Sequence, residues 1–318
     1  MTNARGRVVA LAGAAAWLCG ALTALAVPPG AVSKTALFVC EHRAIAALHP
    51  DPKLRNPDVF AGKLCESISG LPRTYAEARA YIDNMGATFA PYFFVNARTF
   101  YIDAALERAA ADGATQVVVL GAGFDSRAYR FHASLPQLRF FEVDLPAMIE
   151  EKKKRIAAVL GAVPDYVRYA PIDFDRQKLE GVLPAVGYDA GQKTFFILEG
   201  VTMYVKEAGD AATLRFIARN SAPGSRVVYD YVLKRVIQGR TQGMYAIGEN
   251  SRGVAMFGEP FVTGWTPRGA GAFAGRQGLK VIEDLDTKEL TQRYLTGSDG
   301  KPDGRMPEGY RILQAQVR

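Results

Sequence analysis

Cysteine and histidine are scarce in this chain of 318 residues, which has three of each and no C-x-x-C pair. A disulfide framework and a structural zinc site are therefore not expected, because both need cysteines or histidines at characteristic spacings. We predict no metal site. His42, His49 and His132 are interpreted as surface or helix-end residues.

The chain also lacks a basic stripe interleaved with aromatic residues, the pattern that follows a nucleic-acid backbone. Its 39 basic and 32 acidic residues give a formal net charge of +7, a mild excess for this length. We therefore expect no nucleic-acid partner. An apolar content of 49% is typical of a globular protein with a sizeable core, and the length suits one large α/β domain or two small ones.

Residues 1–30 differ from the rest of the chain. Arg5 and Arg7 precede an uncharged run over 8–27, and the tripeptide at 24–26 fits a signal-peptidase site. The run is long enough to cross a bilayer, although alanine and glycine make it weakly hydrophobic. A membrane anchor, a cleaved signal peptide and a helix packed on the domain all stay open. We favour membrane association through 8–27 with a cytoplasmic domain, and export is the alternative.

The pattern from residue 31 to about 112 is helical. Apolar residues recur on one helix face over 33–48. A further helix is expected over 99–113, with Thr99 as its N-cap and Gly113 at its end. We predict a helical N-terminal part, 31–112, ahead of the main sheet.

After residue 112, short apolar runs alternate with helical stretches. Strands are predicted over 116–120, 138–144, 166–174, 193–200, 225–232, 279–285 and 310–317. Helices are predicted over 126–134, 146–160, 176–183, 206–220 and 287–295. This alternation implies an α/β fold with a mostly parallel sheet covered on both faces, and the two late strands suit an antiparallel addition.

The stretch 233–278 is the longest without a regular pattern. A long irregular segment in a compact domain is usually functional or disordered. Its methionine, phenylalanine and tryptophan residues make disorder the weaker explanation. We predict a lid or a wall of the substrate site.

Glycines and acidic residues follow four successive predicted strands. They are Gly121, Gly123 and Asp125, then Asp144, then Asp173 with Phe174, then Glu199 with Tyr204 close behind. Ligands of doubly wound sheets bind beyond the carboxyl ends of the strands. The glycines allow a sharp turn and let a ligand approach the backbone closely. An acid about 20 positions later can accept hydrogen bonds from a ribose diol. This series favours a nucleoside ligand.

Each of these residues also has a structural explanation. A single G-x-G turn is weak evidence, and Asp144 or Asp173 could cap a helix. Glu199 could belong to a structural ion pair, and the lysines at 152–154 are interpreted as a solvated helix face. The coincidence at four strand ends favours the ligand.

A dinucleotide site would have a third glycine at position 126 and no acid near the pyrophosphate. This chain has Ser126 there and Asp125 before it. S-adenosyl-L-methionine (SAM) carries an ammonium, a sulfonium, a ribose and an adenine, but no phosphate. We therefore predict SAM as the cofactor. A nucleotide-dependent oxidoreductase and a non-catalytic SAM-binding or interaction domain are the alternatives.

Four ordered segments, GAGFDSRAYR, FFEVDLP, PIDF and ILEGVTMYV, resemble the leucine carboxyl methyltransferase family. The resemblance extends from about residue 32 to the C-terminus through SKTALFVCEHRAIAA, DPKLRNPDVFAGKL, NARTFYID and GEPFVTGW. It implies a class I methyltransferase domain over 31–318, with a Rossmann-like sheet of about seven strands, N-terminal helices and a lid. The implied activity is SAM-dependent O-methylation of a carboxylate or an acidic hydroxyl on a small molecule.

The resemblance also implies roles for single residues. Arg98 would pair with the SAM carboxylate, Gly121 and Gly123 would form the cofactor turn, Asp144 would bind the ribose, Asp173 would face the adenine, Glu199 would line the methionine end, and Tyr204 would lie near the acceptor. Asp125 and Phe174 complete the predicted cofactor site. No histidine follows a predicted strand, which favours a carboxylate or an acidic hydroxyl as the acceptor, since a carboxylate is already ionised at neutral pH and needs no general base.

Overall fold

A computed structural model describes residues 32–65, 70–173 and 176–318 of the chain. Its centre is one seven-stranded sheet in the order β3-β2-β1-β4-β5-β7-β6. The strands are β1 (Gln116–Leu120), β2 (Arg139–Asp144), β3 (Val167–Pro171), β4 (Thr194–Leu198), β5 (Arg226–Val232), β6 (Leu279–Asp286) and β7 (Tyr310–Val317). Only β7 runs antiparallel to its neighbours. The expected sheet of about seven mostly parallel strands is confirmed.

Both faces of the sheet are buried, which explains why its strands read as apolar runs. All five residues of β1 are buried. Val117 and Val119 belong to one core and Val118 and Leu120 to the other, because successive side chains of a strand point to opposite faces. The strand order reverses between β1 and β4. The carboxyl ends of these two strands therefore form the switch point where such sheets bind ligands.

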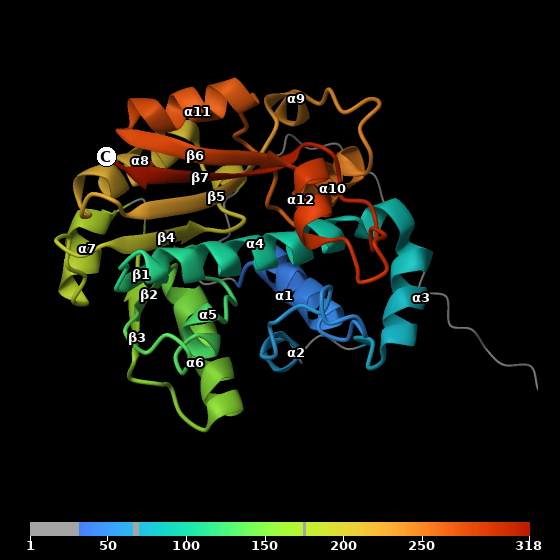
Figure 1. Ribbon diagram of the computed structural model, residues 1–318, viewed down its shortest axis with the longest axis horizontal. Coiled ribbons are helices and arrows are strands. Elements are labelled where there is room, and N and C mark those ends of the chain that lie inside the picture. Colours follow the sequence, from blue (N-terminus) through green and yellow to red (C-terminus); the bar gives the residue numbers. More distant parts are fainter. Residues whose placement is uncertain (1–31, 66–69, 174–175) are drawn as a thin grey trace, which may run out of the picture.

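Two sets of helices cover the sheet (Figure 1). One set belongs to the core that contains Val117 and Val119 of β1. Its helices are α4 (Pro91–Ala111), α5 (Arg127–Arg130), α6 (Pro146–Leu160) and α12 (Thr287–Tyr294). The second core includes α7 (Leu179–Ala185), α8 (Glu207–Arg219) and α11 (Pro267–Arg276).

The N-terminal helices gather beyond the carboxyl ends of the parallel strands (Figure 1). They are α1 (Lys34–Ala46), α2 (Ala61–Leu64), α3 (Tyr75–Met85) and the 3-10 turn η1 (Gly86–Phe89). The predicted helix over 33–48 is confirmed as α1. The predicted cap at Thr99 is wrong, because α4 already begins at Pro91 and the Thr99 hydroxyl donates to the carbonyl of Val95 (2.9 Å) within the helix.

The segment 233–278 is not irregular, contrary to the prediction. It contains α9 (Lys234–Ile237), α10 (Ile247–Met256) and α11. Glycines within α10 and α11 hide the helical pattern in the sequence, since glycine is a poor helix former. Because α11 packs against β6, it belongs to the cover of the sheet. The lid stays a prediction for the part before α11.

Lys152 corrects the interpretation of the lysine run as a solvated face. Its side chain is fully buried, and its Nζ lies 2.8 Å from Oε2 of Glu142, which is also fully buried. Met148, Ile149 and Ile156 bury the same side of α6, so Lys152 falls on the apolar stripe of the helix. Its ammonium also lies 3.4 Å from the carbonyl oxygen of Ala122, in the glycine turn after β1.

The hydrophobic N-terminal segment, 1–30, and its predicted membrane contact over 8–27 lie outside the described residues. Within the described ranges, no helix combines the length and the apolar character needed to span a bilayer.

Replacing Asp210 with asparagine is expected to raise the free energy of unfolding, and the increase should be larger at high pH. Burial, with a smaller effect of Glu207, raises the pKa of Asp210 to about 9. An unfolded aspartate has a pKa of about 3.9. Between these two values the native state holds the extra proton, so the free energy of unfolding of the wild-type protein falls as the pH rises. The Asp210→Asn variant cannot ionise and lacks this slope.

Urea unfolding at about pH 5.5 and about pH 8.5 tests this, with an expected gain of about 1–3 kcal/mol for Asp210→Asn at the higher pH. The exposed Glu180→Gln serves as the control. An equal effect of Asp210→Asn at both pH values would contradict the prediction.

Candidate functional site

The glycine turn after β1 is tightly enclosed. Gly121 and Gly123 have φ values of 71° and 43°, a region that other residues adopt only with strain. A Cβ on Gly121 would lie 2.6 Å from Cγ2 of Val201, which follows β4. A Cβ on Gly123 would lie 3.4 Å from Cβ of Ala36 in α1. The turn therefore lies between the end of β4 and the first N-terminal helix.

Asp144 is joined to this turn. Its Oδ2 accepts a hydrogen bond from the Gly123 amide (2.7 Å) and its Oδ1 accepts one from the Leu145 amide (2.7 Å). The N-cap of α6 is Leu145, so Asp144 is not the cap of that helix. Burial raises the pKa of Asp144, and the two amides partly oppose this shift. Asp144 thus orients the turn and lies beside it.

Asp173 lies at the same edge of the sheet, because β3 is the parallel neighbour of β2 and Asp144 pairs with Pro171. Its carboxylate is 3.6 Å from Nε of Arg176, and its amide donates to Oε1 of Gln177 (2.9 Å). The N-cap of α7 is Lys178, so Asp173 does not cap that helix. Phe174 lies outside the described residues.

Glu199, directly after β4, is buried among three arginines. Its Oε2 lies 2.7 Å from Nη1 of Arg127, and its Oε1 lies 3.1 Å from Nη2 of Arg98 and 3.7 Å from Nη1 of Arg43. Burial would raise the pKa of Glu199, but Arg98, Arg127 and Arg43 together lower it well below its ordinary value. Glu199 is therefore a carboxylate, and the ion pair considered from the sequence is present.

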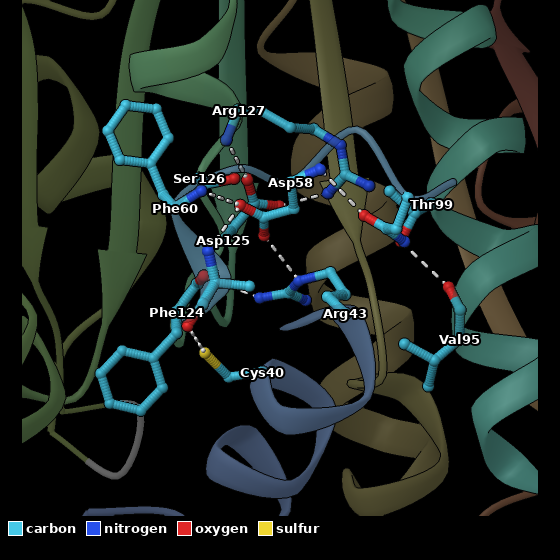
Figure 2. A network of polar contacts seen from close by, with 12 residues as sticks. Cys40, Arg43, Asp58, Phe60, Val95, Thr99, Phe124, Asp125, Ser126 and Arg127 are labelled. Carbon is cyan, nitrogen blue, oxygen red and sulfur yellow. Dashed lines mark hydrogen bonds and ion pairs between the residues drawn. The ribbon is translucent and has the colours of Figure 1, made fainter. Parts of the chain in front are cut away.

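Further carboxylates surround these arginines. Figure 2 shows Arg43 and Arg127 extending toward Asp58 and Asp125. Arg43 Nε lies 2.8 Å from Asp58, and Arg127 pairs with Asp125 through Nη1 and the backbone amide. We call the whole set the arginine cluster: Arg43, Arg98, Arg127 and Arg130 with Asp58, Asp103, Asp125, Glu199 and Asp230. Four guanidinium groups face five carboxylates, which leaves one negative charge.

Asp125 takes a different place from the acidic rim that the sequence predicts. Its side chain is 6% exposed and bound to Arg127, so its charge is already neutralised by the protein. Its sequence neighbour Arg127 is the more central residue of the pair, because it also contacts Glu199 and Asp103.

Sequence reasoning missed Asp230 of β5. Its carboxylate accepts from Nη1 of Arg98 (2.5 Å) and from the amide of Gly200 (2.6 Å), and thereby fixes both the arginine and the turn after β4. A charged residue inside the apolar strand SRVVYDYV was the available signal, since lone charges are rarely buried without a partner.

The interpretation of the histidines as surface or helix-end residues was wrong for His42, which is buried within α1. His49 is also buried but follows the end of α1, and His132 is exposed. His42 lies in α1 with its Nδ1 2.6 Å from the carbonyl oxygen of Phe38. Helical spacing alone could not identify this position as buried, because α1 contacts other elements on more than one side.

Tyr204 ends the 3-10 turn η2 (Thr202–Tyr204), and its ring lies 5.4 Å from that of Phe261. Burial raises the pKa of Tyr204, and the negative charges of Glu259 and Asp230 raise it further. Its hydroxyl is therefore protonated at neutral pH and can position a ligand but not act as a base.

Glu259 joins the segment after α10 to the start of α1. Its carboxylate accepts from the amide of Lys34 (2.9 Å) and from the hydroxyls of Ser33 (2.9 Å) and Thr35. The first turn of α1 is thus held on one side by this segment and on the other by the glycine turn.

Replacing Asp230 with asparagine is expected to destabilise the protein by about 3–5 kcal/mol, because Arg98 would keep its buried charge without this partner. Chemical denaturation measures the change. The exposed pair of Asp112 and Arg226 provides the control, and Asp112→Asn should change stability by less than about 1 kcal/mol. Equal effects of the two substitutions would contradict a structural role of Asp230 in the cluster.

Comparison with known proteins agrees with this architecture. A protein of Streptomyces coelicolor, whose name assigns it to the SAM-dependent methyltransferases, is 37% identical over 209 residues, which are 63% of this chain and 69% of that protein. A Mycolicibacterium vanbaalenii protein named in the same way is 31% identical over 219 residues, 64% of this chain and 68% of its own.

A crystal structure of a DUF574 family protein from Streptomyces avermitilis shares the fold, with a TM-score of 0.54 at 16% identity over 81% of this chain and 97% of that one. The family model for leucine carboxyl methyltransferases matches residues 36–218, more than half of the chain. The chain therefore belongs to the leucine carboxyl methyltransferase family of SAM-dependent methyltransferases.

Proposed function

We propose that this protein transfers the methyl group of SAM to an oxygen of a small molecule, either a carboxylate or an acidic hydroxyl. The observation that carries the proposal is unused hydrogen-bonding capacity at the switch point. Among the described residues, Nε of Arg98 is buried without a hydrogen-bond partner, and Oε1 of Glu199 forms ion pairs with Arg98 and Arg43 but accepts no hydrogen bond. Buried polar groups are normally hydrogen-bonded, so a donor and an acceptor left together fit a ligand that supplies both complements.

The amino-acid end of SAM has these complements, since its carboxylate accepts and its ammonium donates. Charge supports the same ligand. The arginine cluster has one carboxylate more than it has guanidinium groups, and SAM carries a net positive charge. A pyrophosphate ligand would add negative charge to a cluster that already has an excess of it.

The remaining roles follow the strand ends. We assign the ribose to Asp144 beside Gly121 and Gly123, and the adenine side to Asp173 with Phe174. Asp125 acts on the cofactor through Arg127. Tyr204 lies on the acceptor side, near Glu259 and Phe261.

SAM supplies a methyl group activated by its sulfonium. The protein's own contribution is alignment of the acceptor oxygen behind that methyl group, an effect that is worth up to about 7–11 kcal/mol in well-oriented systems. Arg98 and Glu199 are themselves shielded from water, with 4% and 7% of their side chains exposed. A carboxylate acceptor is already ionised at neutral pH, whereas a hydroxyl acceptor must lose its proton during the reaction.

Calorimetric titration of SAM into the full chain tests the proposal. Saturable binding is expected, and Asp144→Ala should weaken it by about 10- to 100-fold, because two hydrogen bonds to a charged group are lost. The exposed Asp165→Ala is the control and should leave the affinity unchanged. Folded wild-type protein that binds no SAM contradicts the proposal, and protection of the protein by NAD against thermal unfolding would support an oxidoreductase instead.

We also propose that residues 8–27 associate with a membrane. The support is their uncharged apolar run after two arginines. The full chain should sediment with membranes after cell lysis, and a chain that begins at Ala31 should stay in the supernatant. A shortened mature protein recovered outside the cytoplasm would identify the segment as a signal peptide and overturn the anchor.

A further inference from the structure

The imidazole of His42 is a buried group with an unused lone pair. Its ring stacks on Phe89 with 4.4 Å between centroids and contacts Phe38 edge-on at 3.9 Å. A carbonyl oxygen can only accept a hydrogen bond, so the proton lies on Nδ1, which faces the carbonyl of Phe38, and Nε2 is left with a lone pair. Within 32–65, 70–173 and 176–318, Nε2 is buried and has no hydrogen-bond partner.

His42 lies on the side of α1 that faces the segment of Glu259, which the proposed function assigns to the acceptor. One side of α1 faces the glycine turn, where Arg43 donates to a backbone carbonyl (2.7 Å). Thr35, Phe38 and His42 recur at helical spacing on another side. This second side meets the segment after α10, since Thr35 bonds to that segment and the ring of Phe38 lies 6.1 Å from that of Phe257.

Two guanidinium groups influence the imidazole of His42 electrostatically. Burial, with smaller contributions from the positive charges of Arg98 and Arg43, lowers the pKa of His42 to about 3, although the hydrogen bond to the Phe38 carbonyl opposes this shift. The imidazole is therefore neutral at physiological pH. A neutral imidazole with a free lone pair is a group that can accept the proton of a hydroxyl.

We propose that Nε2 of His42 binds the hydroxyl of the methyl acceptor and takes its proton, and that the acceptor is a planar aromatic hydroxyl compound. This inference rests on the proposed function and chooses between its two acceptor classes. A carboxylate has no proton to donate to Nε2 and would place its negative charge against the lone pair. The half-buried ring of Phe38 and the exposed ring of Phe257, which lie 6.1 Å apart, offer apolar surface to an aromatic acceptor.

The proposed step conserves atoms and charge. The acceptor oxygen forms a bond to the methyl carbon while the bond from that carbon to sulfur breaks, and its electron pair stays on sulfur. The hydroxyl proton moves to Nε2 and later leaves to water. Transfer to a weakly basic imidazole is favourable at this point, because an oxygen that has gained a methyl group is a far stronger acid than imidazolium.

The experiment compares wild-type protein with His42→Phe, which keeps a stacked ring but has no lone pair. Binding and methylation are measured for phenol, catechol and para-nitrophenol, and for the ring-matched benzoate and para-nitrobenzoate, with labelled SAM as the methyl source. His132→Phe is the control, since His132 is also stacked on a ring, that of Tyr166 at 3.6 Å, but is exposed. SAM affinity is measured for every variant.

We expect His42→Phe to lower kcat/KM for the hydroxyl compounds by at least about 100-fold, as for loss of a general base. Binding of para-nitrophenol should weaken by about 10-fold, as for loss of one hydrogen bond. SAM affinity and benzoate binding should stay within about 3-fold of wild type, a change of less than 1 kcal/mol. His132→Phe should match wild type.

If His42→Phe does not fold, His42→Gln replaces it. The amide oxygen of glutamine can accept a hydrogen bond but cannot take up a proton, so we expect binding of the hydroxyl compounds to be retained and their methylation to be lost.

Equal losses for hydroxyl and carboxyl compounds would overturn the proposal. So would wild-type protein that binds SAM but binds no hydroxyl compound of the set, or that methylates only the carboxylates. Wild-type protein that binds no SAM would instead refute the proposed function, so the two failures are distinguishable.

Discussion

A single carboxylate buried among three guanidinium groups holds the site together. Removing Glu199 and its arginines from water is costly, and only a complete set of partners offsets this cost. The arginines come from three different helices, α1, α4 and α5, while Glu199 directly follows the central strand β4. The N-terminal helices are therefore fixed to the sheet by charge as well as by apolar packing, and the site exists only when both parts have folded.

The sheet and several helices could be predicted from the sequence because their signals are local. Strands buried on both faces read as short apolar runs, and β1 and α6 have the predicted bounds. Two residues mark the ends of α6 clearly: a proline in its first turn, and Gly161 after its last residue, with a φ of 84°. Signals failed where they were ambiguous: α5 is shorter than predicted, and glycines concealed α11.

The acids at the strand ends could be predicted, but their surroundings could not. Lys152, His42 and Asp230 are polar residues on buried surfaces, and each was either assigned to solvent or overlooked. The partners of the two charged residues lie on other elements, Glu142 for Lys152 and Arg98 for Asp230. Hydrophobic periodicity identifies which side of a helix is buried, but carries no information about a charge that is neutralised by a residue distant in the chain.

The contact of Glu259 with the start of α1 has a consequence for the order of folding. The carboxylate that satisfies the Lys34 amide is 225 residues further along the chain. During synthesis, α1 is the first described helix to emerge, yet the last part of its N-terminal cap arrives only after α10 has been made. Closing so long a loop is slow, so the first turn of α1 completes late in folding. By the same reasoning it is among the first parts to fray when the protein is stressed.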